Sequence, residues 1–300
     1  MSKRETLMRQ NAIINKLKKG PSTLKSINEE LALQSDLHGY NLKISNKTFR
    51  RDLDDILSLY QIQIDYNTSN KYYEIINQED ENLSDRILDA FNTLNALNSS
   101  VGYSDYLDLE ERKSTGNQNF HGILHAIKNR KQINITYQSY WQDESSLKTL
   151  QPYLLKEFKN RWYIIAYDIN KNELRTYGLD RITVFDISKK IFKYPANFIP
   201  KEHFKNSFGI IKNDSGKPVQ EVVLRFSAQQ GKYIKSLPLH LSQQILIDNE
   251  EGLTIKLNIY VTFDLEMELL SHGANLEVLE PAFLRESIKQ KLKDALTAYQ

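Results

Sequence analysis

Two arginines near the middle of the chain could bind an anion. Arg175 and Arg181 lie among residues whose pattern is typical of short β-strands, and several tyrosines lie nearby in the sequence. A guanidinium group binds a phosphate in a bidentate manner, while tyrosine adds a hydroxyl and a ring for stacking. In the alternative interpretation, which the periodicity alone favours, Arg181 pairs with Asp180 or Asp186 and the aromatic residues form a core.

A second group of cations lies at the beginning of a predicted helix that Ser45 caps. The helix should turn one apolar face to a core, made by Phe49, Leu53, Ile56, Leu57 and Tyr60. Lys47 and Arg51 then point nearly the opposite way, and Thr48 and Arg50 lie on the flanks. Side chains at this position in a recognition helix contact bases and phosphates in the major groove. The alternative is that these are solvated charges on a small helical domain.

The predicted DNA-binding residues are Ser45, Lys47, Thr48, Arg50, Arg51 and, on a hairpin that follows, Lys71. Further phosphate contacts are predicted for Lys16, Lys18, Lys19 and Lys43.

The elements before residue 77 have the order of a winged helix-turn-helix. Apolar spacing predicts a helix over 4–19 and a second helix, capped by Ser22 or Thr23, with Leu24, Ile27 and Leu31 on its buried face. The helix after Ser45 follows, and then alternating residues predict a β-hairpin over 62–76. The connection over 33–44 is longer than the turn of a compact helix-turn-helix, which leaves the docking angle open.

The rest of the chain changes from helical to strand periodicity and back. We predict an acidic joint at 78–82, an amphipathic helix over 83–97 and another near 120–127. Short strands then recur to about Ile187 and suggest a small barrel. They cover 133–140, 150–158, 161–167 and 174–177, with Trp162 and Ile164 on one strand face and Tyr163 and Ile165 on the other. The last hundred residues alternate as βαββαβ with a final helix, typical of a small α+β sandwich.

Composition and charge favour a cytoplasmic protein of two or three domains with an uneven charge distribution. The 300 residues include no cysteine, no apolar stretch of membrane-spanning length and no signal-peptide core at the N-terminus. Residues 1–76 carry 12 Lys/Arg against 9 Asp/Glu, 77–118 carry 3 against 9, and 119–196 carry 13 against 7. Two basic blocks therefore flank an acidic one. Ordinary surface variation would also explain this charge pattern.

Catalytic motifs are not apparent, so we expect neither an enzyme nor a bound cofactor. The sequence has no phosphate-binding P-loop, dinucleotide fingerprint or nucleophile elbow. His121 and His125 have a spacing that can bind zinc, but Gly122 stands where a metalloprotease would need its glutamate, and no third ligand is evident. We expect two surface histidines rather than a metal site.

Four segments in order resemble the WYL-domain transcriptional regulators of bacteria. They are Trp162-Tyr163-Ile164, Ile135-Thr136-Tyr137, Pro152 to Lys156 and Leu179 to Ile182. The run from Ser45 to Leu53 resembles the recognition helix of that family, and the segment from Gly273 to Leu284 resembles its C-terminal extension.

The resemblance implies an α+β multidomain protein. Its parts would be a winged helix-turn-helix (1–77), a helical linker (78–118), a WYL domain with an Sm-like (SH3-like) β-barrel (119–196) and a C-terminal extension (197–300) for dimerisation. It implies a ligand face that carries Arg175 and Arg181. Gln151 stands where a histidine often precedes the proline of the second strand. The ligand-binding residues predicted on this basis are Tyr137, Ser139, Gln151, Tyr153, Arg175 and Arg181.

We therefore predict a homodimeric, ligand-responsive transcriptional regulator. It would bind double-stranded DNA and an anionic effector, a nucleotide or a single-stranded nucleic acid. The alternative is a phage-defence accessory protein whose WYL barrel binds RNA or a nucleotide second messenger.

Overall fold

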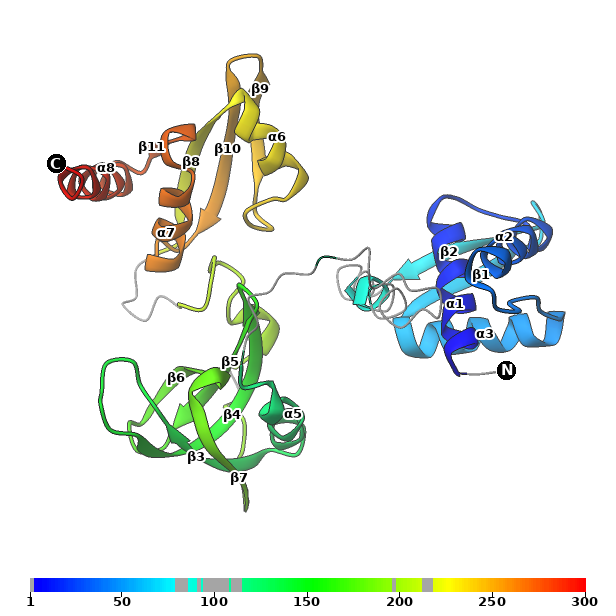
Figure 1. Ribbon diagram of the computed structural model, residues 1–300, viewed down its shortest axis with the longest axis horizontal. Coiled ribbons are helices and arrows are strands. Elements are labelled where there is room, and N and C mark those ends of the chain that lie inside the picture. Colours follow the sequence, from blue (N-terminus) through cyan, green and yellow to red (C-terminus); the bar gives the residue numbers. More distant parts are fainter. Residues whose placement is uncertain are drawn as a thin grey trace. The chain divides into compact units, whose positions relative to one another are not determined.

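The computed structural model describes residues 3–78, 86–90, 93, 108, 115–195, 198–211 and 218–300 (Figure 1). The chain divides into two compact units, Met1–Glu110 and Glu111–Gln300. Most of the linker helix predicted over 83–97 lies outside the described residues, although 86–90 are helical. Among the described helices, none combines the length and apolar character that a membrane span requires.

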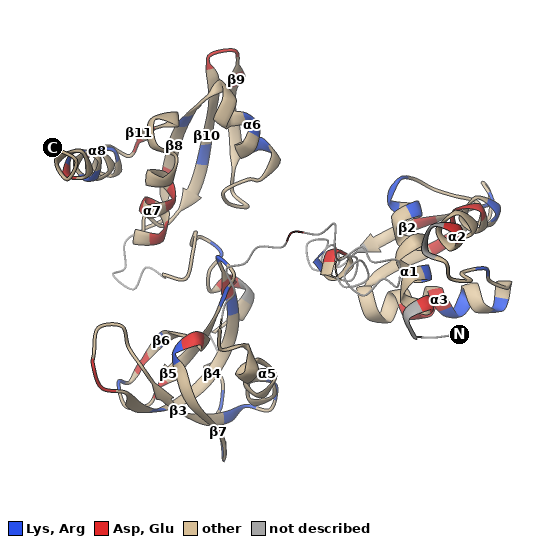
Figure 2. Ribbon diagram, in the orientation of Figure 1, with Lys and Arg blue, Asp and Glu red and all other residues tan. Residues whose placement is uncertain are grey.

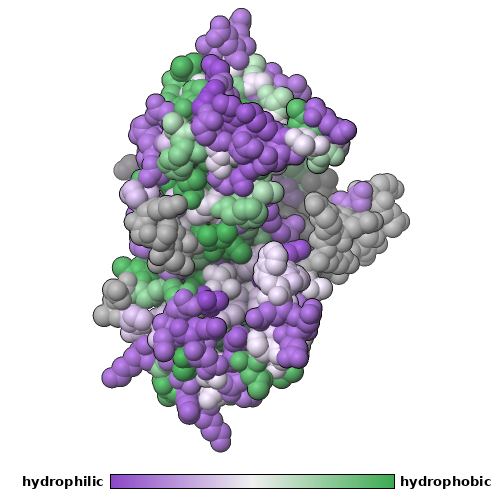
Figure 3. All heavy atoms as spheres, turned by 90° about the vertical axis from the view of Figure 1, so that its left-hand side faces the viewer, coloured by the Kyte–Doolittle hydropathy of each residue, from purple (hydrophilic) through white to green (hydrophobic). Residues whose placement is uncertain are grey.

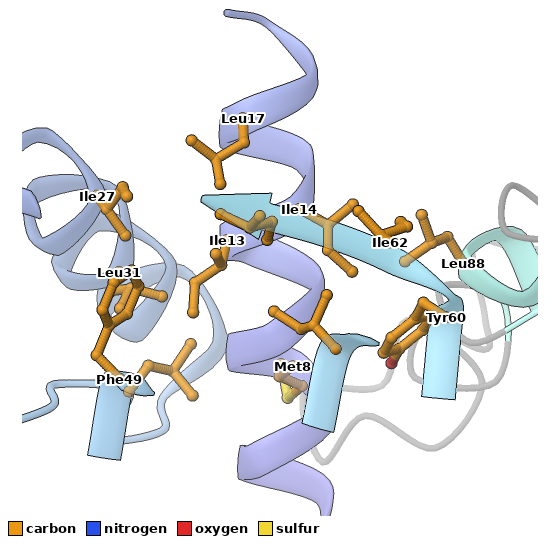
Figure 4. Close-up of a cluster of buried hydrophobic side chains, with 13 residues drawn as sticks. Met8, Ile13, Ile14, Leu17, Ile27, Leu31, Phe49, Tyr60, Ile62 and Leu88 are labelled. Atoms are coloured by element: carbon orange, nitrogen blue, oxygen red, sulfur yellow. The ribbon is translucent and has the colours of Figure 1, made fainter. Parts of the chain in front are cut away.

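The first unit begins with three helices followed by a hairpin. The elements are α1 (Lys3–Lys18), α2 (Leu24–His38), α3 (Asn46–Tyr60), β1 (Ile62–Asn67) and β2 (Tyr72–Gln78). Thr23, one of the two predicted caps, accepts a hydrogen bond of 3.2 Å from the Ser26 amide and starts α2. Apolar side chains from all three helices and β1 meet in one core, with Leu88 also contributing (Figure 4). Packing thus ties the short helix at 86–90 to this unit.

The buried face of α3 differs from the predicted one at two positions, Asp52 and Leu57. Phe49, Asp52, Ile56 and Tyr60 are buried, whereas Leu57 is 49% exposed. The prediction of Leu57 in the core was wrong because a charged residue, Asp52, occupies the inward face and rotates it away from Leu57.

Asp52 is buried because Arg9 of α1 neutralises it. Arg9 Nε donates to Asp52 Oδ2 at 2.5 Å, Arg9 Nη2 donates to Asp52 Oδ1 at 2.7 Å, and both side chains have no exposed surface. A bidentate pair fixes the relative orientation of the two groups as well as their distance. The pair therefore sets the rotation of α3 about its axis, which decides which residues of α3 face the solvent.

Rings connect α3 to the hairpin. The Phe49 and Tyr73 ring centroids are 4.9 Å apart in an edge-to-face contact, and Tyr73 and Tyr66 are also 4.9 Å apart. Contacts of this kind favour a defined geometry beyond simple burial. The hairpin is therefore held in a fixed position relative to α3.

The second unit begins with a five-stranded antiparallel sheet. After η2 (Asn117–Asn119) and α5 (Phe120–Lys128) come β3 (Lys131–Tyr137), β4 (Ser146–Phe158), β5 (Arg161–Asp168), β6 (Glu173–Gly178), η3 (Leu179–Arg181) and β7 (Ile182–Ile191). The strand order is β6-β5-β4-β3-β7. Among the described strands β6 and β7 are edges that do not pair with each other, so the sheet is open and the expectation of a closed barrel is corrected. Residues 138–140, predicted to extend the first strand, form part of a loop.

A buried hydrogen bond joins the ends of β5 and β6. The Tyr177 hydroxyl donates to Asp168 Oδ2 at 2.5 Å, and the other carboxylate oxygen accepts from the amides of Asn170 and Lys171. Asp168 has no exposed surface. These bonds satisfy a buried carboxylate and hold the turn that leads into β6.

The C-terminal part has the predicted βαββαβ order and a final helix. After η4 (Pro200–Glu202) it comprises β8 (Gln220–Ser227), α6 (Ala228–Ser236), β9 (Gln244–Asn249), β10 (Gly252–Ile259), α7 (Phe263–Ser271), η5 (Gly273–Asn275), β11 (Leu276–Glu280) and α8 (Ala282–Thr297). The sheet order is β11-β8-β10-β9, with antiparallel neighbours. Apolar residues of β8, β10, β11, α6, α7 and α8 form its core.

Removal of one member of the Arg9–Asp52 pair should destabilise the first unit. Arg9→Met leaves a buried carboxylate without its partner, at a cost of about 3–5 kcal/mol, whereas Arg9→Met with Asp52→Leu should restore most of the loss. Because Trp141 and Trp162 both lie in the second unit, we choose amide hydrogen exchange of α1 and α3. The exposed Arg50→Met is the matched control. Equal protection in Arg9→Met and the native chain would contradict this role.

The Tyr177 hydroxyl should make stability of the second unit fall at alkaline pH. Burial, followed by the hydrogen bond to Asp168, raises the pKa of Tyr177 above its ordinary value of 10.0. The stabilisation is therefore complete below that value and is lost as the pH rises and the unfolded chain ionises. Tyr177→Phe should cost about 1–3 kcal/mol at neutral pH and should flatten the alkaline loss.

Urea unfolding followed by Trp162 fluorescence at neutral pH and about one unit above the ordinary tyrosine pKa measures both effects. Tyr299→Phe, at a residue 91% exposed, is the control. An alkaline loss in Tyr177→Phe as steep as in the native chain would assign it to other tyrosines.

Candidate functional site

A cavity of about 460 Å³ lies beside β5 and the edge strand β6. Strand pairing sets Tyr163 opposite Gly178 and Ile165 opposite Thr176, and the cavity is lined by Tyr163, Ile165 and Thr176 together with Arg175 and Arg181. Ile164 belongs to the core of the sheet and Trp162 packs against that core. The predicted alternation of β5 is thus confirmed. Tyr163 and Ile165 line the cavity, although they were not among the predicted ligand-binding residues.

Arg181 is held at the cavity by two rings and a carboxylate. Its guanidinium carbon lies 5.2 Å from the centroid of Tyr137 and 4.7 Å from that of Tyr140, and its Nε lies 3.7 Å from Asp180 Oδ1. The Tyr140 hydroxyl donates to the other oxygen of Asp180 at 3.1 Å. Cation–π contacts and the carboxylate thus fix the guanidinium of Arg181.

Gly178 makes room for this arrangement. A Cβ atom at this position would overlap Asp180 Oδ1 and would lie 2.7 Å from Arg181 Nη2. Any other residue would push the carboxylate and the guanidinium out of place. The glycine before η3 is therefore part of the site, although it makes no polar side-chain contact.

Arg175 also has a carboxylate partner, but an exposed one. Its Nε donates to Glu173 Oε1 at 2.5 Å, and both side chains are about half exposed (49% each). The alternative interpretation of the sequence is therefore right about the pairing of Arg181 with Asp180, and Arg175 is paired as well. The cavity nevertheless remains open beside both residues, and exposed ion pairs contribute only about 0–1 kcal/mol, so an incoming anion can replace Glu173.

Two of the three buried tyrosines that line the cavity, Tyr137 and Tyr163, are neutral hydrogen-bonding groups. Burial is the main cause that raises the pKa of Tyr137, and the Arg181 guanidinium opposes it. Burial likewise raises the pKa of Tyr163, with Arg161 acting in the opposite direction. The Gly178 amide donates to the Tyr137 hydroxyl oxygen at 3.3 Å. Both phenols keep their protons at neutral pH, which leaves donors beside the guanidinium groups.

Four of the six predicted ligand residues lie together, and two do not. Tyr137, Ser139, Arg175 and Arg181 line the cavity. Tyr153 instead lines a neighbouring cavity, and Gln151 lines neither of these two cavities. The Tyr153 hydroxyl donates to Gln151 Oε1 at 3.4 Å.

A third cavity, of about 350 Å³, adds cations that the sequence analysis missed. Trp141, Lys148 and Lys171 line it together with Arg175 and Tyr177. Trp141 is 92% exposed. Lys148 of β4 comes near Arg175 only through the fold of the sheet. Lys171 lies in the turn between β5 and β6, just before Arg175 in the sequence, and its proximity was overlooked.

The α3 side chains predicted to contact DNA fall into two groups. Ser45 caps the helix by accepting from the Thr48 amide at 3.2 Å, and the two hydroxyl oxygens lie 3.1 Å apart. Lys47, Arg50 and Arg51 are exposed and make no hydrogen bond or ion pair with any residue that the structure describes. Figure 2 shows basic segments on α3. The hydroxyls thus start the helix, and the three cations remain available.

Lys71 is also exposed and lies in the turn between β1 and β2, where its φ is 57°. His121 and His125 are both exposed on α5, and His125 Nδ1 lies 3.3 Å from the Asn129 amide nitrogen. Within the described part of the chain, no three potential metal-ligating side chains form a group.

Comparisons with known proteins assign two domains. The model of the WYL domain matches residues 118–187, and that of the WCX domain matches residues 218–296. No curated protein matches the chain.

Two similar solved structures are distant. One is proteasome accessory factor B/C (PafBC) of Arthrobacter aurescens, with 18% identity over 97% of this chain and 46% of that one, at a TM-score of 0.34. The chain thus spans less than half the length of that structure. The other is a CRISPR Cas-related protein, with 14% identity over 98% of this chain and 85% of that one, at a TM-score of 0.39. The two domain matches show that the chain contains a WYL domain followed by a WCX domain.

Proposed function

We propose that the chain is a transcription regulator that binds duplex DNA through α3 and responds to an anionic, nucleic-acid-derived effector in the cavity around Arg175 and Arg181. In this proposal residues 1–77 are a winged helix-turn-helix, 78–118 a helical linker, 119–196 the WYL domain and 197–300 a dimerising extension. The observation that carries it is the pair of cationic sites, one on a helix face and one in a cavity.

The charges of α3 support the DNA-binding part. The one acidic residue on its buried face, Asp52, is neutralised by Arg9, while Lys47, Arg50 and Arg51 extend into solvent near the beginning of the helix. Lysine and arginine side chains that replace counterions along the phosphate backbone supply much of the affinity for DNA. The first turns of α3 enter the major groove, and Lys71 on the hairpin contacts the backbone.

The cationic groups at the cavity support the proposed binding of an anionic effector. Arg161 Nη1 lies 4.0 Å from Asp180 Oδ2, so three guanidinium groups, of Arg161, Arg175 and Arg181, share the carboxylates of Asp180 and Glu173. A phosphate offers more charge and more acceptor oxygens than Glu173 does. An anionic effector therefore gains charge-assisted hydrogen bonds when it enters.

In a homodimer, such an effector can regulate the arrangement of the two DNA-binding units. Leu237, Leu241 and Ile245 of the WCX domain are 78%, 92% and 52% exposed, and hydrophobic residues interrupt the hydrophilic surface in Figure 3. We propose that a homodimer covers them. The effector then acts by binding one arrangement of the two DNA-binding units more tightly than the other.

Loss of the α3 arginines should abolish specific duplex binding. Arg50→Ala with Arg51→Ala removes two exposed cations without disturbing the core. Affinity for a fragment of the protein's own promoter region should fall at least about tenfold, and the slope of log affinity against log salt should become shallower by about 0.9 per lost phosphate contact. Fluorescence anisotropy over a salt series measures both.

Lys189→Ala with Lys190→Ala, which removes two exposed cations from β7, is the matched control. Retained promoter affinity in the α3 variant would refute this DNA-binding surface. Weak, sequence-independent duplex binding by the native chain, beside tight oligonucleotide binding in the cavity, would instead favour the defence accessory protein.

Loss of the cavity arginines should remove effector binding and spare the DNA-binding unit. Arg175→Ala with Arg181→Ala should weaken binding of a short single-stranded DNA at least about tenfold, because each charge-assisted hydrogen bond contributes about 1.5–3 kcal/mol. The single-stranded DNA is titrated in the Arg50→Ala/Arg51→Ala background, so that α3 cannot bind it. Duplex binding by the Arg175→Ala/Arg181→Ala variant is measured with Arg50 and Arg51 intact and should persist. Arg225→Ala, which breaks an exposed pair with Glu277, is the control. Undiminished probe binding would place the anion site elsewhere.

A further inference from the structure

A second cavity, of about 550 Å³, adjoins the cavity of the arginines. The two cavities share Glu173, Leu174 and His203 as lining residues, so one wall separates them. Each volume lies within the range of about 300–1,000 Å³ that is typical of small-molecule sites. A ligand that reaches past the shared wall can occupy both.

Four tyrosine and phenylalanine side chains line the second cavity. Tyr153 and Tyr167 of the sheet, Phe198 of the following segment and Tyr260 after β10 all line it. The Tyr153 and Phe198 centroids are 4.9 Å apart, and the Tyr194 hydroxyl donates to the Tyr153 carbonyl oxygen at 3.0 Å. The contact with Tyr153 holds the Phe198 ring in place before any ligand arrives, which is what a stacking surface for a planar group requires.

The charge of the second cavity is opposite to that of the first. Glu173 and Glu202 line it, and none of the described residues that line it is a lysine or an arginine. The carboxylates repel a phosphate, whereas they accept hydrogen bonds from N–H groups on the edge of a base. Asn172 and Asn206 add amide groups that both donate and accept. The chemistry therefore suits a neutral heteroaromatic ring.

Glu173 connects the two cavities. Its carboxylate holds Arg175 on one side and lines the aromatic cavity on the other. A phosphate that takes the Nε and Nη2 donors of Arg175 displaces the Glu173 carboxylate, since both then compete for the same N–H groups. The displaced carboxylate then lies beside the ring-binding cavity.

We propose that the aromatic cavity is a base subsite, so that the effector is a nucleotide whose phosphate takes Arg175 from Glu173 while its base stacks on Phe198 and Tyr260. This inference rests on the proposed anion site. In this proposal Glu173 competes with the effector phosphate for Arg175, and Phe198 determines the preference for a base.

The test is calorimetric titration of the full chain, in the Arg50→Ala/Arg51→Ala background, with ribose 5-phosphate and with the four nucleoside 5′-monophosphates. At least one nucleotide should bind at least about tenfold more tightly than ribose 5-phosphate, as expected for stacking of one base. Phe198→Leu should remove most of that preference and leave ribose 5-phosphate binding unchanged. Glu173→Gln should tighten binding of ribose 5-phosphate several-fold, because the competitor loses its charge.

Tyr260→Leu is a second variant in case Phe198→Leu disturbs the packing of Tyr153, and Tyr233→Leu, at a residue 63% exposed, is the control. Equal binding of ribose 5-phosphate and all four nucleotides would overturn the base subsite and leave the anion site intact. A preference for a nucleotide over ribose 5-phosphate that persists in both Phe198→Leu and Tyr260→Leu would also overturn the base subsite. If neither ribose 5-phosphate nor any nucleotide binds, or if Arg175→Ala changes nothing, the anion site fails and the proposed function fails with it.

Discussion

The central site depends on the interactions of the Asp180 carboxylate. It accepts a hydrogen bond from Tyr140, lies 3.7 Å from Arg181 Nε and 4.0 Å from Arg161 Nη1, and packs where Gly178 has no side chain. Asp180 Oδ1 and Arg181 Nε are nevertheless buried without a hydrogen-bond partner. A buried polar atom in that state costs free energy unless something else binds it. The site is thus preorganised by Asp180 but not fully satisfied by it.

Neutralisation of buried charge organises the first unit as well. Arg9 and Asp52 cancel each other in the core, and this fixes the rotation of α3 so that Lys47, Arg50 and Arg51 face solvent. In the first unit the pair thus leaves three other cations exposed on α3. In the second unit Arg181 is itself the cation paired with Asp180, and it still lines the cavity.

Local sequence patterns predicted the helices and strands better than they predicted which side chains contact one another. The βαββαβ order, the hairpin and the alternation of Tyr163 and Ile165 all follow from apolar spacing, which is a short-range signal. Arg9 and Asp52 are 43 positions apart, so no spacing rule joins them. The same absence of a local rule explains why Leu57 was placed in the core and why an open sheet was taken for a barrel. Lys148 and Trp141 were missed because tertiary structure alone brings them to Arg175.

The most direct test is to purify the protein from its own cells under native conditions, denature it, and determine what is released. We expect a phosphate-bearing compound that absorbs as a nucleobase does, bound by the native chain and lost from the Arg175→Ala/Arg181→Ala variant. Release of the same compound from both proteins, or of an anion-free compound from the native chain, would contradict the claim that these guanidinium groups bind an anionic effector.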